Sequence, residues 1–322
     1  MSRPAFFFLI ALAGACAFAP AAAAGESAPA GALGAGTHTL QLSHDGQQRK
    51  YLLHIPAGYD PARPAPLVLA FHGGGGHAEF MADEARYGLV GKAERAGFVV
   101  VFPNGYSRFP GGKLATWNAG GCCGNARDRG VDDVGFVRAL VARVQSQVSI
   151  DGARVFATGM SNGGMLAHRL ACEAPDVFRA VASVAGTDAT TRCAPSRPAS
   201  VLHIHARNDT HVLFTGGAGE DAFRDASKVM DFVSVPETVA RWVKRNQCAP
   251  APRRILDRPG AYCEAYSGCA GGVSVQLCVT EGGGHSWPGA KTVRRGKEAA
   301  SAALDANDAI WDFFTRASRP GT

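Results

Sequence analysis

The chain has 322 residues, of which 46% are hydrophobic and 19% are charged, and its formal net charge is +6. This composition is typical of a globular protein long enough to bury a large core. Basic residues are scattered except for one cluster, so the charge gives only a weak preference for anionic substrates or surfaces, and no nucleic-acid-binding motif is present. The cluster consists of Lys291, Arg294, Arg295 and Lys297.

The first 24 residues indicate a secretory signal peptide. Arg3 precedes the apolar stretch AFFFLIALAGACAFA, and small residues follow up to about Ala24. A membrane anchor is the alternative, but the apolar run is shorter than the ~20 residues that span a bilayer. We therefore expect a secreted protein, periplasmic or extracellular, without stable membrane insertion. Residues 25–37 are rich in glycine, alanine and proline and predict a flexible leader, followed by one domain over 38–322.

Strand-like and helix-like segments alternate after the leader. THTLQLSH and RKYLLHIP flank Asp45-Gly46, which predicts a hairpin. Six further strands are predicted, most of them short apolar runs of the kind covered on both faces. They are PLVLAFH, GFVVVFP, RVFATG, AVASVAG, SVLHIHA and VSVQLCVTE. Helices are predicted over 134–148, capped by Asp132 or Asp133, and over 165–172, 236–244 and 304–316. This order predicts one α/β domain with a mostly parallel sheet.

Residues 159–163 form the sequence G-x-S-x-G between a predicted strand and a predicted helix. In that place Ser161 would lie in a sharp turn, with Gly159 and Gly163 allowing neighbouring backbone to pass close by. The helix N-terminus would add a positive dipole beside the serine. Ser161 is then either a nucleophile or only a helix cap, and a nucleophilic serine needs a base.

A histidine and an aspartate follow the last two of these strands. His285 lies on the glycine-rich loop EGGGHSWPG, and Asp209 lies in RNDTH after the strand VLHIHA. The order Ser161, Asp209, His285 is that of the α/β-hydrolase triad, which predicts His285 as the base and Asp209 as the acid that orients it. The other readings are a surface-loop histidine and a turn-forming Asn-Asp pair. The competing acids are Asp221, Asp225 and Asp231.

The remaining histidines give weaker signals. His203 and His205 share one face of a strand and are expected to be core or sheet-end residues rather than metal ligands. His168 lies on the helix after Ser161 and is expected to be packed or on the surface. His77 and His211 lie in loops that could line a cleft.

A glycine run, FHGGGG, follows the third predicted strand. Glycines at 73–76 free backbone N–H groups to point at a developing oxyanion, together with the N–H of Asn162. A phosphate-binding loop is the rival interpretation, but the run lacks the Lys-Ser/Thr ending of a P-loop.

Eight cysteines remain after removal of Cys16 with the signal peptide, an even number that predicts up to four disulfides in an exported chain. No pair has the C-x-x-C spacing of a zinc site, and no metal is expected. The eight are Cys122, Cys123, Cys172, Cys193, Cys248, Cys263, Cys269 and Cys278.

One pairing follows from local structure. AYCEAYSGC and VSVQLCVTE flank residues 270–272 and predict a hairpin, in which Cys263 falls opposite Cys278. That leaves Cys248 for Cys269.

The first four cysteines are then left to pair among themselves. We expect the adjacent Cys122 and Cys123 to bond separately to Cys172 and Cys193, in either order, rather than to each other.

Several segments together resemble the secreted polyhydroxybutyrate-depolymerase-like and feruloyl-esterase-like α/β-hydrolases, from about residue 38 to the C-terminus. They are HGGGG, TWNAGGCCG, GVDDVGF, GMSNGGM, LACE, VLHIHARND, SVPETVARW, EGGGHSWPG and DAIWDFF. The resemblance implies an α/β-hydrolase fold with a mostly parallel, eight-stranded sheet and helices on both faces. It implies a serine esterase without a cofactor, with Ser161 as nucleophile, Asp209 as acid and His285 as base.

The resemblance also implies an oxyanion hole and a cysteine pattern. Gly74 and Asn162 would form the hole, with Gly75 as a nearby candidate. Members of the family have paired cysteines at positions like Cys122 and Cys123 and others at positions like Cys172, Cys193, Cys248 and Cys269, whereas Cys263 and Cys278 look like an addition.

Four residues are candidates for contact with substrate. Trp117, Asn118 and Trp287 lie in loops expected to rim the cleft, where aromatic rings suit a polymer or a feruloyl ring, unless the tryptophans instead pack these loops onto the body. Arg207 is a cation two residues before Asp209, at a position where members of the resembled family more often have an uncharged residue. It could favour a carboxylate-bearing substrate.

The sequence therefore predicts a secreted hydrolase of a polyester, such as polyhydroxybutyrate, or of feruloylated polysaccharide. Poly(aspartic acid) hydrolases also resemble this family, so cleavage of an anionic polyamide is an alternative. A non-catalytic binding protein on a hydrolase scaffold is a third possibility.

Overall fold

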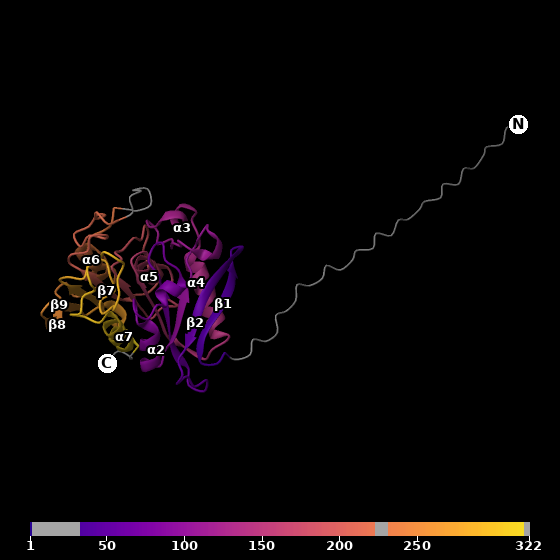
Figure 1. The fold of residues 1–322 in the computed structure, drawn as a ribbon, viewed down its shortest axis with the longest axis horizontal. Helices are drawn as coiled ribbons and strands as arrows, with labels where there is room; N and C mark the ends of the chain where they lie inside the picture. Colours follow the sequence, from indigo (N-terminus) through magenta and orange to yellow (C-terminus); the bar gives the residue numbers. More distant parts are fainter. Residues whose placement is uncertain (2–32, 223–230, 319–322) are drawn as a thin grey trace. The chain divides into compact units, whose positions relative to one another are not determined.

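The computed structural model describes residue 1, residues 33–222 and residues 231–318 of the chain (Figure 1). The expected signal peptide with Cys16, and the leader up to residue 32, lie outside these ranges. The first strand begins at Gly36, two residues before the expected start of the domain. No helix within the described ranges is both long and apolar enough to cross a membrane.

Ten strands of the described residues form one sheet in the order β1-β2-β4-β3-β5-β6-β7-β10-β9-β8. The strands are β1 (Gly36–His44), β2 (Gln47–Ile55), β3 (Ala65–Phe71), β4 (Val99–Pro103), β5 (Ile150–Met160), β6 (Ala180–Val184), β7 (Ser200–Ala206), β8 (Arg253–Arg258), β9 (Ala261–Tyr266) and β10 (Val275–Thr280). The run from β4 through β3, β5, β6 and β7 to β10 is parallel, and the outer pairs are antiparallel. The prediction of a mostly parallel sheet with an antiparallel first hairpin is confirmed.

The sheet has two strands more than the predicted eight. Strand β9 is the hairpin partner of β10, and β8 pairs with β9 at the edge of the sheet. The sequence of β8 is RRILDR, and most of its side chains are exposed. It has no continuous apolar run, because an edge strand in contact with water does not require one, and the apolar pattern therefore missed it.

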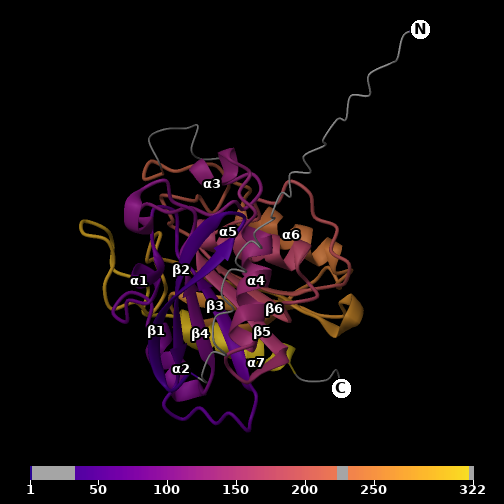
Figure 2. The same ribbon diagram turned by 90° about the vertical axis from the view of Figure 1, so that its right-hand side faces the viewer.

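Helices cover both faces of the sheet (Figure 2). The helices are α1 (Ala78–Met81), α2 (Leu89–Ala96), α3 (Gly124–Asp128), α4 (Asp133–Gln145), α5 (Asn162–Glu173), α6 (Val235–Arg245) and α7 (Ala306–Ala317), with short 3-10 turns η1 (Pro110–Gly112) and η3 (Ala270–Gly272). Alternate residues of β3 point to opposite faces. Leu67, Leu69 and Phe71 pack in one core with α4, α5 and α6, whereas Val68 and Ala70 pack in a second core with α2 and α7.

The four predicted helices are present as α4, α5, α6 and α7. Asp132 caps α4 by accepting from the N–H of Gly135 at 2.8 Å, and Asp305 caps α7 by accepting from the N–H of Asp308 at 3.0 Å. These side chains satisfy backbone donors that the first helical turn leaves without an intrahelical partner.

Four disulfides join the eight described cysteines, and two of the pairings agree with the sequence argument. Cys263 lies opposite Cys278 in the β9–β10 register and is bonded to it, with a Cα–Cα distance of 4.1 Å. Cys248 is bonded to Cys269.

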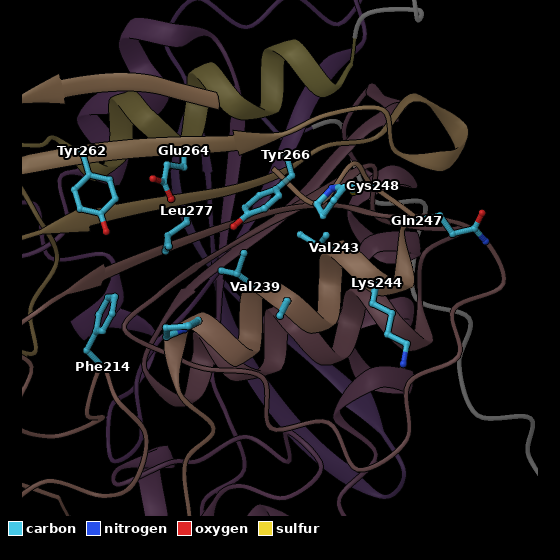
Figure 3. A pocket seen from close by; sticks show the side chains of 13 residues that line it. Phe214, Val239, Val243, Lys244, Gln247, Cys248, Tyr262, Glu264, Tyr266 and Leu277 are labelled. Atoms are coloured by element: carbon cyan, nitrogen blue, oxygen red, sulfur yellow. The ribbon is translucent and has the colours of Figure 1, made fainter. Parts of the chain in front are cut away.

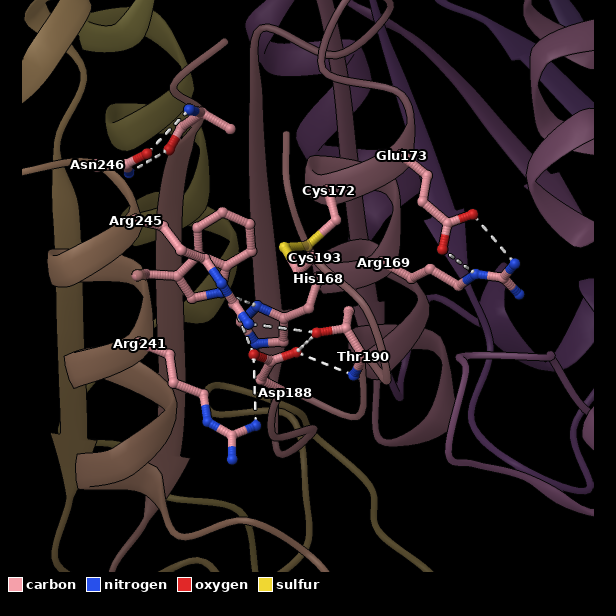
Figure 4. The surroundings of a disulfide bond; sticks show 12 residues. His168, Arg169, Cys172, Glu173, Asp188, Thr190, Cys193, Arg241, Arg245 and Asn246 are labelled. Atoms are coloured by element: carbon pink, nitrogen blue, oxygen red, sulfur yellow. Dashed lines mark hydrogen bonds and ion pairs between the residues drawn. A yellow bond between two sulfur atoms is a disulfide. The ribbon is translucent and has the colours of Figure 1, made fainter. Parts of the chain in front are cut away.

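The expected pairing of the other four cysteines is wrong. Cys122 is bonded to its neighbour Cys123, and Cys172 is bonded to Cys193 (Figure 4). The reason is spatial. Helix α5 brings Cys172 to within 5.2 Å of Cys193, measured between Cα atoms, which lies in the usual range for a disulfide and leaves the adjacent pair to each other.

Replacing both Cys263 and Cys278 by alanine should lower the free energy of unfolding by about 3 kcal/mol. The bond closes a segment of 15 residues, and its loss frees that segment in the unfolded chain. Chemical denaturation of the oxidised proteins measures the change. An unchanged denaturation midpoint would contradict a stabilising role for this cross-link.

Candidate active site

Ser161 lies between β5 and α5 in a backbone conformation that residues other than glycine rarely adopt. Its φ is 55° and its ψ is −122°, and its N–H donates to the carbonyl of Val184 at 2.8 Å. Although Ser161 occupies the N-cap position of α5, its side chain makes no capping hydrogen bond. The hydroxyl is therefore not used as a cap, and the strained turn presents it at the end of the strand.

The two glycines of G-x-S-x-G are required by close packing. A Cβ on Gly163 would collide with the carbonyl oxygens of Phe71 and His72 at the end of β3. A Cβ on Gly159 would lie 2.5 Å from the carbonyl carbon of Gly163. Because neither position has room for a side chain, α5 can begin directly against β3 and β5, and the turn at Ser161 is held sharp.

Asp209 and His285 are in direct contact. Nδ1 of His285 lies 2.7 Å from Oδ2 of Asp209, while Oδ1 accepts the backbone N–H groups of His211 at 2.7 Å and Val212 at 3.0 Å. Burial by itself would raise the pKa of the Asp209 carboxyl, but the neighbouring His285 and hydrogen bonds from two imidazoles hold it far below its usual range. Asp209 is therefore a permanent carboxylate that fixes the His285 proton on Nδ1 and leaves Nε2 as the basic atom.

The sheet brings Ser161 to the same edge as this pair. Strands β5, β6, β7 and β10 are neighbours and run parallel. Ser161 follows β5, Asp209 follows β7 and His285 follows β10, so all three come after carboxyl ends that meet at one edge.

Of the competing acids, Asp231 is exposed and Asp221 has partners of its own. Asp221 binds Lys297 and accepts from the hydroxyl of Thr210 at 2.5 Å. Asp225 lies outside the described residues.

Asn208 fixes the loop that carries His285. Its Oδ1 accepts the N–H of Gly284 at 3.0 Å, and its Nδ2 donates to Glu298 at 2.6 Å. Gly283 has a φ of 105°, and a Cβ there would lie 2.6 Å from the backbone nitrogen of Ser301. Gly283 before His285 is therefore required by close packing, whereas the sequence showed only that the loop is rich in glycine.

His211, which the sequence placed in a loop that could line a cleft, lies directly beside His285. Its ring stacks on that of His285 with 4.4 Å between centroids and 16° between planes. Burial and the neighbouring His285 lower the pKa of His211 to about 4. The His211 ring is therefore neutral where it covers the imidazole of His285. Its position two residues after Asp209 was the sequence feature that could have placed it beside the acid and His285.

The glycine run after β3 lies against the turn at Ser161. A Cβ on Gly73 would be 3.4 Å from that of Ser161. Gly75 donates its N–H to Ala115 at 2.8 Å, so the candidacy of Gly75 for the oxyanion hole is wrong. The N–H of Gly74 has no hydrogen-bond acceptor among the described residues.

His72 fixes the peptide that carries the Gly74 N–H. Its Nε2 accepts the N–H of Gly105 at 2.9 Å, which leaves the imidazole proton on Nδ1, and Nδ1 donates to the carbonyl of Gly73 at 2.8 Å. That carbonyl and the Gly74 N–H belong to one planar peptide unit and point in opposite directions. Burial lowers the pKa of His72 to about 4 and keeps this arrangement neutral.

Trp117 does not rim a cleft. It is fully buried, and its indole N–H donates to the carbonyl of His72 at 2.9 Å. Its backbone N–H and carbonyl bind the side-chain amide of Asn162 at 2.7 and 2.9 Å. The expectation of substrate contact is wrong for Trp117, because this buried residue ties the glycine run to the start of α5.

The other two rim candidates are also structural. Asn118 is buried, with its N–H donated to the buried carboxylate of Asp133 and its amide donated to Val131. Trp287 is buried and donates to Asn307 at 3.1 Å. The reading in which both tryptophans pack their loops onto the body is correct, as expected for large rings with one polar atom to satisfy.

Arg207 is half-exposed but does not stand alone. Its guanidinium binds Glu281 at 3.0 Å and the hydroxyl of Tyr262 at 3.2 Å, and it lies over the ring of Phe214. Phe214 and Tyr262, with Tyr266, line a pocket of about 580 Å³ between α6 and strands β9 and β10 (Figure 3). The charge of Arg207 is thus balanced, which weakens the argument for an anionic substrate.

Within the described residues, no group of three or more histidine, cysteine, aspartate or glutamate side chains is arranged to hold a metal ion. The reactive groups of the site are the hydroxyl of Ser161, the imidazole of His285, the carboxylate of Asp209 and nearby backbone N–H groups.

Comparison with known proteins places the chain among esterases. Residues 49–221 match the family described as esterase PHB depolymerase. Feruloyl esterase B of Piromyces equi is 31% identical over 74% of the chain, and the chain spans only 42% of the length of that protein. The putative esterase NocK of Nocardia uniformis subsp. tsuyamanensis is 34% identical over 76% of the chain and 72% of its own length.

A solved structure supports the fold. The acetyl xylan esterase from Aspergillus awamori superposes with a TM-score of 0.56, covering 86% of this chain and 99% of its own, at 15% identity. The fold is that of the α/β-hydrolases.

Replacing Gly163 by alanine should lower the free energy of unfolding by about 1–3 kcal/mol, because the new methyl group would collide with the end of β3. Gly152→Ala is the control, since Gly152 lies on β5, the strand that leads to the turn, but has only the end of the Gln145 side chain within 4 Å. Denaturation of the two variants measures the difference. Equal stabilities would show that the close packing at Gly163 is not required.

Proposed function

Since the chain belongs to the esterase PHB depolymerase family of ester-cleaving hydrolases, we propose that it is an exported serine esterase with the triad Ser161, His285 and Asp209. The contact of 2.7 Å between His285 and Asp209, at the sheet edge where Ser161 stands in its strained turn, is the observation that carries this proposal. A serine without an oriented base would be a poor nucleophile at neutral pH.

The first half-reaction forms an acyl-enzyme. Nε2 of His285 takes the proton of the Ser161 hydroxyl as its Oγ attacks the ester carbonyl carbon. The negative charge on the carbonyl oxygen is bound by the backbone N–H groups of Asn162 and Gly74. The tetrahedral intermediate then collapses, and His285 returns the proton to the leaving alcohol.

The second half-reaction releases the acid. Water gives a proton to His285 and attacks the acyl carbon, and Ser161 recovers its proton when the intermediate breaks down. Asp209 stays ionised throughout and stabilises the imidazolium that forms in each step. Backbone donors already in place at Asn162 and Gly74 stabilise the oxyanion without reorganisation, and each such donor contributes about 10²–10³ in kcat in known cases.

The substrates that fit this proposal are ester bonds of a polyester, such as polyhydroxybutyrate, or of feruloylated polysaccharide. The family description supports the first, and the feruloyl esterases among the relatives support the second. The balanced charge of Arg207 provides no support for an anionic polyamide.

Export is supported by covalent structure. Four disulfides among the described residues suit an oxidising compartment, and the N-terminal segment has the pattern of a secretory signal.

Ser161→Ala should reduce turnover of a p-nitrophenyl short-chain ester by about 10⁴-fold or more, since the attacking oxygen is removed. Ser267→Ala, at an exposed serine, serves as control and should retain wild-type turnover. Undiminished turnover by Ser161→Ala would refute the assignment of Ser161 as the nucleophile. It is also the result expected if the chain were a non-catalytic binding protein and the turnover came from a contaminating enzyme.

A panel of methyl ferulate, polyhydroxybutyrate and poly(aspartate) should show release of acid from one or both esters and none from the polyamide. Wild type and Ser161→Ala are assayed side by side by chromatography of the products. Cleavage of poly(aspartate) alone would replace the esterase proposal by amide hydrolysis.

A further inference from the structure

Three buried histidines form a continuous chain behind the acid of the site. Nε2 of His168 on α5 lies 3.3 Å from Nδ1 of His203 on β7, and Nε2 of His203 lies 3.0 Å from Nδ1 of His205. Each of the three side chains is at most 1% exposed. His203 and His205 were expected to be core residues, which is correct, but their ring nitrogens face one another rather than only apolar neighbours.

The direction of every hydrogen bond in the chain is fixed from one end. The indole Nε1 of Trp242 on α6 lies 2.9 Å from Nδ1 of His168, and an indole nitrogen can only donate. Nδ1 of His168 must therefore accept, so its proton lies on Nε2 and is donated to His203. The same reasoning places the proton of His203 on Nε2, and then that of His205 on Nε2.

The last donor of the chain reaches the turn that begins at Asp209. Nε2 of His205 donates to the carbonyl of Val212 at 2.8 Å and lies 3.3 Å from Oδ2 of Asp209. The N–H of Val212 donates to the other carboxylate oxygen at 3.0 Å. His205 thus closes the turn from one side and faces the same oxygen that binds His285.

Two of the buried rings, those of His168 and His203, stay neutral, as this directed chain requires. Burial lowers the pKa of His168 to about 4 and holds that of His203 well below its usual range. The charge of Asp188 acts on His168, and Asp188 is bound by Arg245 at 2.6 Å and by the hydroxyl and N–H of Thr190 (Figure 4). Because its charge is balanced by Arg245, Asp188 does not force a proton onto His168.

We propose that His205, with His203, His168 and Trp242 behind it, is a positioning device that sets the place of the Asp209 carboxylate against His285. This proposal rests on the triad proposed above and adds to it four residues that touch neither substrate nor the reacting atoms. Plain core packing would not need imidazoles, since apolar side chains of similar size would fill the space without buried polar atoms to satisfy.

A matched pair of variants separates positioning from packing. Methionine and glutamine have similar size, but only glutamine carries a donor that can reach Val212 and Asp209. His205→Met should lower kcat about tenfold or more with KM unchanged, the effect expected for loss of a donor beside a charged group. His205→Gln should recover most of that loss. Equal kcat values for the two variants would overturn the proposal.

A double-mutant cycle tests whether His205 acts through Asp209. In an Asp209→Asn background, where the carboxylate is already lost, His205→Met should cause little further decrease in kcat. A decrease of the same size in both backgrounds would overturn the proposal. His54→Met is the control, because His54 is a buried histidine of β2, bound to Thr37 and Glu94, and its loss should leave kcat unchanged.

A measurement on the wild-type protein is independent of whether the variants fold. Nitrogen-15 NMR of the imidazole rings should show His168, His203 and His205 each protonated at Nε2 only. A proton on Nδ1 of His205 would break the chain and overturn the proposal. If Ser161→Ala keeps full activity, the proposed function fails instead, and the NMR result still reports on the chain.

Discussion

A buried carboxylate is the constraint on which the arrangement around the site depends. Removing the Asp209 charge from water is costly unless its oxygens are bound, and here two backbone N–H groups and the imidazole of His285 bind them. These partners come from different parts of the chain, so the carboxylate is satisfied only when β7, the turn after it and the loop after β10 are all in place. The same contacts that make the burial tolerable also orient His285.

The sequence predicted the positions of the motif residues well because each motif stood directly after an apolar run. Continuous burial on both faces makes the central strands visible as short apolar segments, and the residues after them fall at the sheet edge. The helices with regular spacing and a polar cap, such as α4 and α7, were predictable for the same reason. The short helices α1, α2 and α3 lacked such a pattern and were not predicted.

What the sequence could not show was which polar atoms meet. The sequence suggested that Trp117 lies at a cleft, but its indole N–H donates to the carbonyl of His72 in the core. It also suggested that the adjacent Cys122 and Cys123 do not pair, because it could not show that Cys193 lies next to Cys172. The roles of Asn208 and His211 likewise depend on contacts across the fold. Such partnerships are set by tertiary distance, which neither composition nor periodicity encodes.

The charged strand β8 has a consequence for behaviour in solution. It lies at an open edge of the sheet, where unpaired backbone groups could join the strand of another molecule. Its sequence places Arg253, Arg254 and Arg258 along that edge. Two molecules that paired through β8 would bring several arginines into proximity, and the resulting repulsion opposes edge-to-edge aggregation through this strand.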